Sequence, residues 1–118
     1  MQRIMLKAKI HRATVTETNL GYEGSLVLDE DLMAEAFMLP YEQVHVYNIS
    51  NGERFITCLT KGEKGSGIVG VQGIAADRIR AGDKLTISSY VVLGDEEIDF
   101  FMPKNLFVDE KNRIREIQ

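Results

Sequence analysis

The stretch QVHVYNISNGERFITCLT, residues 43–60, decides the fold class. Two runs rich in β-branched and aromatic residues, QVHVYNI (43–49) and ERFITCLT (53–60), lie on either side of Ser50-Asn51-Gly52. An Asn-Gly pair between two such runs is the strongest short-range signal of a β-hairpin, because both residues accept the positive φ angles of a tight turn. The stretch therefore predicts two antiparallel strands.

The flanking sequence also has the period of strands. In LKAKIHRATV, the polar side chains of Lys7, Lys9 and His11 alternate with apolar ones, which predicts a half-buried strand over about residues 3–16. The segments IVGVQG and KLTISSYVVL predict further strands, and IDFFMPKNLFVD predicts a last pair broken at Pro103. Most of the chain is therefore expected to form short strands.

Helical signals are few. LDEDLMAEAFMLP starts with acidic residues, carries Leu32, Met33, Ala36 and Phe37 at helical spacing and ends at Pro40, so it predicts one short helix. A second short turn or helical stretch is expected through Ala75-Ala76. Six or more short strands with one or two short helices suggest a small closed β-barrel, which also removes exposed strand edges.

Composition limits the class of protein. The length of 118 residues predicts a single domain, residues 1–118, and the 44% apolar and 27% charged composition is that of a globular protein. A net charge of −4 makes nucleic acid an unexpected partner. We expect no metal site, since there is a single cysteine, Cys58, and only two histidines. Without a signal peptide or a long apolar run, we expect a cytoplasmic protein with no membrane partner.

Two Gly-Ser pairs, Gly24-Ser25 and Gly65-Ser66, raise the possibility of chemistry on the chain itself. Gly65-Ser66 lies in the polar, glycine-dense segment KGEKGSG, which predicts a mobile surface turn with nothing to hold the peptide bond. Gly24-Ser25 stands directly before the apolar run LVL, so Ser25 is expected at the start of a strand. A fixed serine hydroxyl can attack the preceding carbonyl to give an ester, which eliminates to dehydroalanine and hydrolyses to a pyruvoyl group. A strand-entry turn without chemistry is the alternative.

Several stretches together resemble one family. MLKAKIHRATVT, NLGYEGSLVLDEDLM, NGERF, VQGIAA and GDKLTI match, in order along most of the chain, the aspartate 1-decarboxylases, which are pyruvoyl enzymes that make β-alanine for pantothenate synthesis. The resemblance implies a double-psi β-barrel and a homotetramer with active sites between subunits. It also implies self-cleavage between Gly24 and Ser25 into a β chain of residues 1–24 and an α chain of residues 25–118. Ser25 would become the pyruvoyl group, the electron sink that replaces pyridoxal phosphate in decarboxylation of L-aspartate.

The resemblance also implies roles for individual residues. Lys9 and Arg54 match the residues that bind the substrate carboxylates, which agrees with the need for local cations on an acidic protein. His11 and Tyr22 match residues that line the cleavage region, and Thr57 matches the residue that polarises the Gly24 carbonyl. Binding of substrate by backbone groups is implied for the following three residues: Gly73, Ile74 and Ala75.

The sequence departs from the family at functional positions. Cys58 stands where the family usually has a tyrosine that protonates the decarboxylated product, and a thiol ends several bonds short of a phenol oxygen. The alternatives are a bridging water, another donor among Tyr22, Tyr47 and His11, or slow decarboxylation. Gln72 stands where the family has asparagine, and its extra methylene moves the amide by about 1.5 Å. Ile74 replaces a small residue, so the pocket is expected to be narrower.

Three hypotheses follow for function. The first is an active aspartate decarboxylase with a changed proton donor, which is cleaved by itself or with a maturation factor. The second is an unprocessed or weakly active barrel that serves as a non-catalytic or regulatory subunit. The third is a small β-barrel that binds a ligand or peptide, in which every motif above is structural.

Overall fold

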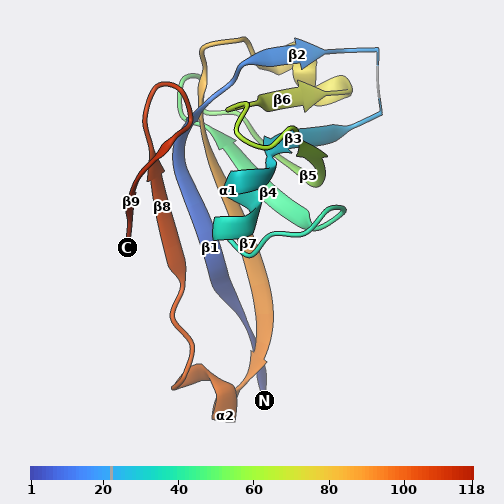
Figure 1. Cartoon of the computed structure of the whole chain (residues 1–118). Coiled ribbons are helices and arrows are strands. Elements are labelled where there is room, and N and C mark those ends of the chain that lie inside the picture. The colour runs from blue at the N-terminus through green and yellow to red at the C-terminus, as the bar shows by residue number, and fades with distance from the viewer. Residues whose placement is uncertain (22) are drawn as a thin grey trace.

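The computed structural model describes residues 1–21 and 23–118 and consists mainly of strands (Figure 1). The strands are β1 Gln2–Thr14, β2 Glu17–Asn19, β3 Ser25–Asp29, β4 Gln43–Asn48, β5 Arg54–Gly62, β6 Val69–Gln72, β7 Lys84–Gly94, β8 Lys104–Val108 and β9 Ile114–Ile117. The helices are α1 Glu30–Glu35, the 3-10 helix η1 Ile74–Arg78 and α2 Asp95–Ile98. The predicted mainly β fold with short helices is confirmed. No helix of the described residues is long and apolar enough to cross a membrane.

Backbone pairing closes most of the strands into a ring. The order of paired strands is β2-β6-β3-β5-β4-β7-β1-β8-β9. Because β1 ends at Thr14 and β2 begins at Glu17, these two strands form one nearly continuous segment, and Thr16 N donates to Val69 O at 2.9 Å beside β6. The order therefore returns to the segment from which it started, as a small barrel of β1/β2, β6, β3, β5, β4 and β7.

The interior of this ring is the core of the molecule. Aliphatic side chains from each of its strands are 2% exposed or less: Ile10, Val15, Leu26, Leu28, Val44, Val46, Leu59, Val69, Val71, Leu85 and Ile87. Along β4 and the first half of β5, more buried and more exposed residues alternate as the strand period requires. The antiparallel β4–β5 hairpin predicted from the sequence is confirmed.

The connection of this hairpin differs from the tight turn that Asn51-Gly52 suggests. It spans residues 49–53, and Asn48 N donates to Glu53 O at 2.8 Å across its base. The Asn48 and Asn51 side chains each accept a backbone N–H two residues further on, from Ser50 and Glu53. These local side-chain bonds stabilise a longer loop, in which Gly52 has a φ of +80°.

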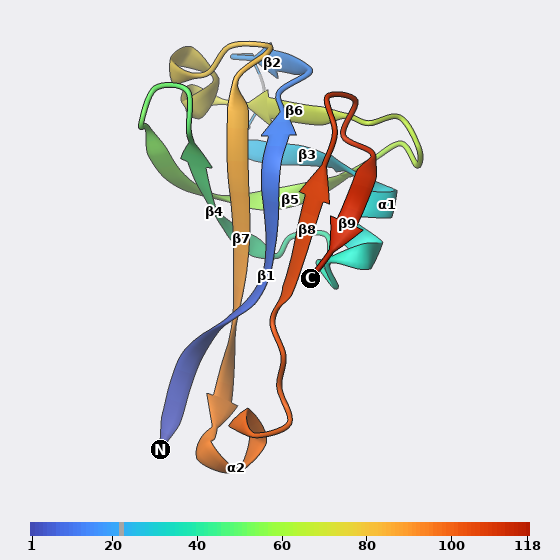
Figure 2. The ribbon, with the colours of Figure 1, turned by 90° about the vertical axis from the view of Figure 1, so that its left-hand side faces the viewer.

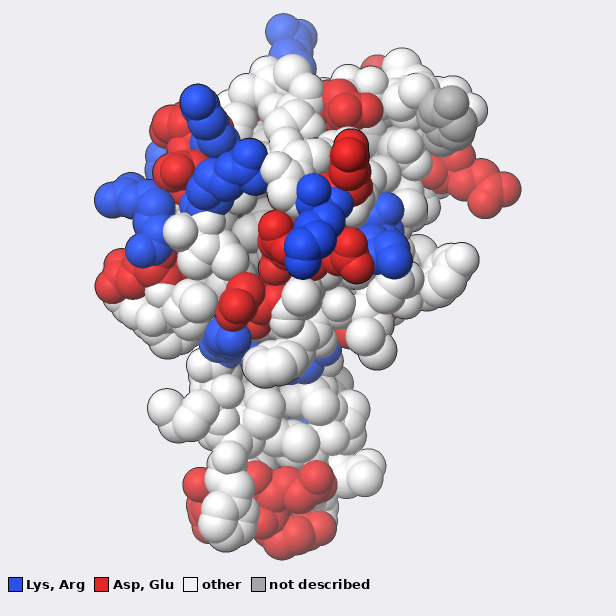
Figure 3. Space-filling model, viewed as in Figure 1, with Lys and Arg blue, Asp and Glu red and all other residues white. Residues whose placement is uncertain are grey.

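The long β1–β7 pair extends beyond the barrel and carries α2 at its end, close to the N-terminus (Figures 1 and 2). The prediction of a strand before Pro103 is wrong, because the chain forms α2 there and then an irregular segment before β8. Phe100 and Met102 are 90% and 84% exposed, so neither packs as a strand residue on the core. Acidic side chains gather at this end of the molecule (Figure 3).

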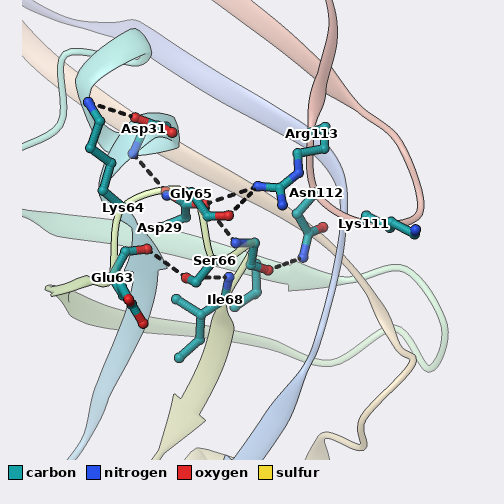
Figure 4. A network of polar contacts seen from close by, with 12 residues as sticks. Asp29, Asp31, Glu63, Lys64, Gly65, Ser66, Ile68, Lys111, Asn112 and Arg113 are labelled. Carbon is teal, nitrogen blue, oxygen red and sulfur yellow. Dashed lines mark hydrogen bonds and ion pairs between the residues drawn. The ribbon is translucent and has the colours of Figure 1, made fainter.

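The Gly65-Ser66 turn is held firmly, in contrast to the expectation from its polar sequence. The buried Asp29 carboxylate accepts two hydrogen bonds from the turn, from Gly67 N at 2.7 Å and from Gly65 N at 3.0 Å (Figure 4). Arg113 Nη1 donates to the Gly65 carbonyl at 2.6 Å. The Ser66 hydroxyl donates to the Glu63 carbonyl at 2.6 Å, which fixes it within the turn. The second Gly-Ser pair is therefore a structural turn.

Candidate active site

Ser25 begins β3, as its position before LVL predicts. β3 lies between β5 and β6, and Ser25 pairs with Gln72 in the antiparallel β3–β6 ladder. The Ser25 hydroxyl donates a hydrogen bond to Gln72 Oε1 at 3.0 Å. The glutamine at this position therefore reaches the serine and holds its hydroxyl at the mouth of the strand.

A cleft of about 460 Å³ opens over this peptide and brings several predicted residues together. It is lined by Glu23, Gly24, Ser25, Tyr41, Cys58, Leu59, Thr60 and Gln72. Because Leu26 pairs with Leu59 in the parallel β3–β5 ladder, Cys58 lies beside Ser25 on the neighbouring strand. The Ser25 hydroxyl, the Gly24 carbonyl, the Gln72 amide and the exposed Cys58 thiol thus share one cleft.

Gly73 packs directly behind the Gly24 peptide. Its φ of +88° lies in the region that favours glycine, and a Cβ on Gly73 would lie 2.6 Å from Gly24 Cα and 2.7 Å from Gly24 N. Only a glycine permits this approach of two backbones. Ile74 and Ala75 follow at the start of η1, and their side chains lie outside the described part of the structure.

A second, larger groove of about 840 Å³ holds the predicted carboxylate-binding residues. It is lined by Lys9, His45, Val46, Tyr47, Arg54, Phe55, Ile56, Thr86, Ser88 and Tyr90, none of them acidic. Neither Lys9 nor Arg54 forms an ion pair with any described residue, so both charges are available to a ligand. The groove is suited to an anion, because cations without protein partners gain most from binding one.

The groove and the cleft are separate within one chain. Arg54 and Cys58 lie on the same face of β5, four residues apart, which corresponds to about 13 Å along a strand. The Arg54 guanidinium lies 5.0 Å from the centre of the Tyr47 ring on β4, on the side of β5 away from β3 and Ser25. The Arg54 guanidinium therefore points away from Ser25 of its own chain.

The other predicted site residues lie elsewhere. Thr57 lies on the more buried face of β5, opposite to Cys58. His11 is stacked on Phe107 of β8 with ring centres 4.4 Å apart, and its Nε2 lies 2.9 Å from Asn105 Oδ1. It does not line the Ser25 cleft, and Tyr22 lies outside the described residues.

The cleft also contains residues that we did not predict from the sequence, above all Tyr41. This tyrosine follows Pro40 in a loop and reaches the cleft because its N–H donates to Leu59 O on β5 at 2.9 Å. No sequence motif indicates such a contact between distant segments. His45 of the groove could have been found from alternation, since it shares a face of β4 with Tyr47.

These features define a small β-barrel protein with a serine hydroxyl held beside a Gly-Ser bond and a separate groove lined by two cations that have no ion-pair partner among the described residues. The model of the aspartate decarboxylase family matches residues 1–115, and the chain belongs to this family. The chain is 51% identical over 118 residues to the aspartate 1-decarboxylase of Cupriavidus necator, an alignment that covers all of this chain and 98% of that one. It is 50% identical over 115 residues to the Syntrophus aciditrophicus enzyme of the same name, covering 98% and 99% of the two chains. With the Ralstonia nicotianae enzyme it shares 49% identity over 118 residues.

Proposed function

We propose that this chain is an aspartate 1-decarboxylase, which converts L-aspartate to β-alanine and CO2 for pantothenate and coenzyme A synthesis in the cytoplasm. Family membership over residues 1–115 and relatives of that name at about half identity support this activity. The observation that carries the proposal is the Ser25 hydroxyl, held by Gln72 at the Gly24-Ser25 peptide. The alternative of a non-catalytic barrel is not favoured, because the departures from the family leave this arrangement in place.

The first reaction is on the chain itself. Ser25 Oγ attacks the Gly24 carbonyl carbon, and the acyl group moves from nitrogen to oxygen to give an ester. Loss of the Gly24 carboxylate leaves dehydroalanine at position 25, and water then converts it to a pyruvoyl group with release of ammonia. The products are a β chain of residues 1–24 and an α chain of residues 25–118. Gly73 supports this reaction by fixing the Gly24 backbone, and Gln72 by orienting the hydroxyl.

A pyruvoyl group at position 25 fits the surroundings of Ser25. The side chain opens into the cleft between the Gln72 amide and the exposed Cys58, so a carbonyl formed there is both hydrogen-bonded and accessible. Such a group supplies an electron-accepting carbonyl for the electron pair that CO2 leaves behind. We assign Cys58 to the proton transfers of chain cleavage in this cleft, with Tyr22, His11 and Thr57 as supporting groups.

Substrate binding needs both parts of the surface. Lys9 and Arg54 bind the two carboxylates of aspartate, and backbone groups of Gly73, Ile74 and Ala75 contact the substrate near residue 25. Because the Arg54 guanidinium points away from Ser25 of its own chain, we propose a homotetramer in which the groove of one subunit faces the cleft of another. Exposed apolar residues around the groove, including Ile56 at 60% exposure, favour such burial between copies.

The purified chain should convert L-aspartate to β-alanine, followed by proton NMR, while Ser25→Ala should form none. Size-exclusion chromatography with light scattering should give four copies of the chain. Absence of β-alanine from protein that has been cleaved at 24/25 would refute the proposed substrate. Absence of cleavage after prolonged warming, also with a maturation factor from a relative's host, would refute the mechanism.

A further inference from the structure

Tyr41, which lines the cleft, has an unusual backbone conformation with a positive φ. Leu39, Pro40, Tyr41 and Glu42 form a turn in which Glu42 N donates to Leu39 O at 3.1 Å. With proline in second place and a φ of +70° at Tyr41 in third place, this is the geometry of a type II turn. Glycine or asparagine normally occupies the third place, because bulky side chains are strained at positive φ.

The turn is fixed against the strand that carries Cys58. Tyr41 N donates to Leu59 O at 2.9 Å, and Leu59 N donates to Glu42 O at 3.0 Å. These bonds set both Tyr41 and Glu42 against Leu59, directly beyond the end of the β4–β5 ladder, where Gln43 pairs with Cys58. Tyr41 and Cys58 both line the Ser25 cleft.

The Tyr41 side chain is free to act in the cleft. It is 89% exposed and lines the cleft together with Ser25, so none of the core depends on its ring. A strained aromatic residue that contributes so little to packing favours a functional explanation over a structural one.

Decarboxylation in this cleft needs a proton donor that reaches past residue 25. The carbon that loses CO2 belongs to the substrate and lies further out than residue 25 itself. The Cys58 thiol is on a short side chain beside residue 25, and the Thr60 hydroxyl is equally short. Among the described residues of the cleft, Tyr41 carries its hydroxyl on the longest and most rigid side chain.

We propose that Tyr41 is a catalytic residue of this enzyme, whose phenol gives its proton to the α-carbon of aspartate as CO2 departs. The phenol O–H bond breaks, the C–H bond forms with the electron pair of the broken C–CO2 bond, and the phenolate recovers a proton from water. This role rests on the proposed function. It also explains how the enzyme can work with a cysteine at position 58.

Two variants test the role from opposite directions. Tyr41→Phe keeps the ring and the strain but loses the hydroxyl, so kcat should fall by roughly 100-fold, within the range of a general acid. Tyr41→Asn loses the hydroxyl but relaxes the turn, so it should lower kcat equally while raising the melting temperature. A purely structural residue cannot give higher stability and lower turnover in this way.

Phe37 provides the matched control. It is also an exposed aromatic residue at positive φ, +55°, but it lies beneath Lys104 and outside the cleft. Phe37→Asn should therefore change the melting temperature in the same sense as Tyr41→Asn and leave kcat within twofold of the wild type.

Two readouts do not depend on turnover rate. Cleavage at 24/25, followed by denaturing mass spectrometry, should proceed within twofold of the wild-type rate in Tyr41→Phe. When the substrate carbon is not protonated, a proton can reach residue 25 instead, and hydrolysis then leaves alanine there and releases an aldehyde. The N-terminal peptide of the α chain should therefore contain alanine at least tenfold more often per turnover in Tyr41→Phe.

The results separate this proposal from the proposed function. Cleaved Tyr41→Phe protein with wild-type kcat and no excess of alanine would overturn the role of Tyr41 alone. Wild-type protein that is cleaved but makes no β-alanine would overturn both proposals.

Discussion

Gly73→Ala tests the packing behind the cleavage site most sharply. The added Cβ would lie 2.6 Å from Gly24 Cα, whereas ordinary contact begins at 3.4 Å. The Gly24 backbone must therefore move by roughly 1 Å, a displacement that costs about 100-fold in rate when it misaligns reacting groups. The positive φ at position 73 adds a loss of about 1–2 kcal/mol in the free energy of unfolding, because alanine is strained there.

Gly82→Ala separates the two effects. Gly82 has a φ of +95°, but a Cβ there would have nothing within 4 Å. This control should show the same loss of stability and cleave at the wild-type rate. The assay is a time course of intact mass on freshly purified chains at equal folded fraction, measured by circular dichroism. Equal cleavage rates in the two variants would refute the reasoning that contact with Gly24 governs maturation.

Three further predictions concern other parts of the molecule. Gln72→Leu removes the acceptor of the Ser25 hydroxyl, and the intact-mass assay should show cleavage about tenfold slower; an unchanged rate would count against this bond. Arg54→Lys keeps the charge but not the guanidinium fork, so KM for aspartate should rise about tenfold with unchanged cleavage, and an unchanged KM would exclude Arg54 from binding. Burial raises the pKa of Asp29, but N–H bonds from the backbone and the Arg113 charge outweigh burial, so the net pKa is below 3.8. Urea unfolding at pH 7 should therefore show Asp29→Asn less stable by about 2 kcal/mol. The difference should shrink as pH falls from about 4 through the lower folded-state pKa of Asp29, below which the wild-type carboxylate is also neutral; a difference that persists below that pKa would contradict this.

Local signals in the sequence predicted the strands and the start of the site. The β4–β5 hairpin follows from alternation around Asn51-Gly52, and Ser25 starts β3 because an apolar run follows it. Both depend on residues close together in the chain. The ring of strands, by contrast, was expected from the number of short strands and from the family resemblance, and the ladders supply its order.

Contacts between distant segments escaped sequence analysis. Pro40 indicates a turn, but a tyrosine in third place does not suggest a type II turn, and nothing local places Tyr41 beside Leu59. The firm Gly65-Ser66 turn was missed for the same reason, because Arg113 and Asp29 hold it from other elements. The separation of Arg54 from Ser25 likewise depends on the contact of the Arg54 guanidinium with the Tyr47 ring.

The central claim is that Ser25 breaks the Gly24-Ser25 bond and becomes the reactive group. Denaturing mass spectrometry of the purified chain, before and after warm incubation, tests this most directly. The account predicts a fragment of residues 1–24 and a fragment of residues 25–118 that is lighter by one ammonia than the same fragment with an N-terminal serine, with Ser25→Ala remaining whole. A wild-type chain that turns over aspartate while its mass stays that of 118 intact residues would contradict it.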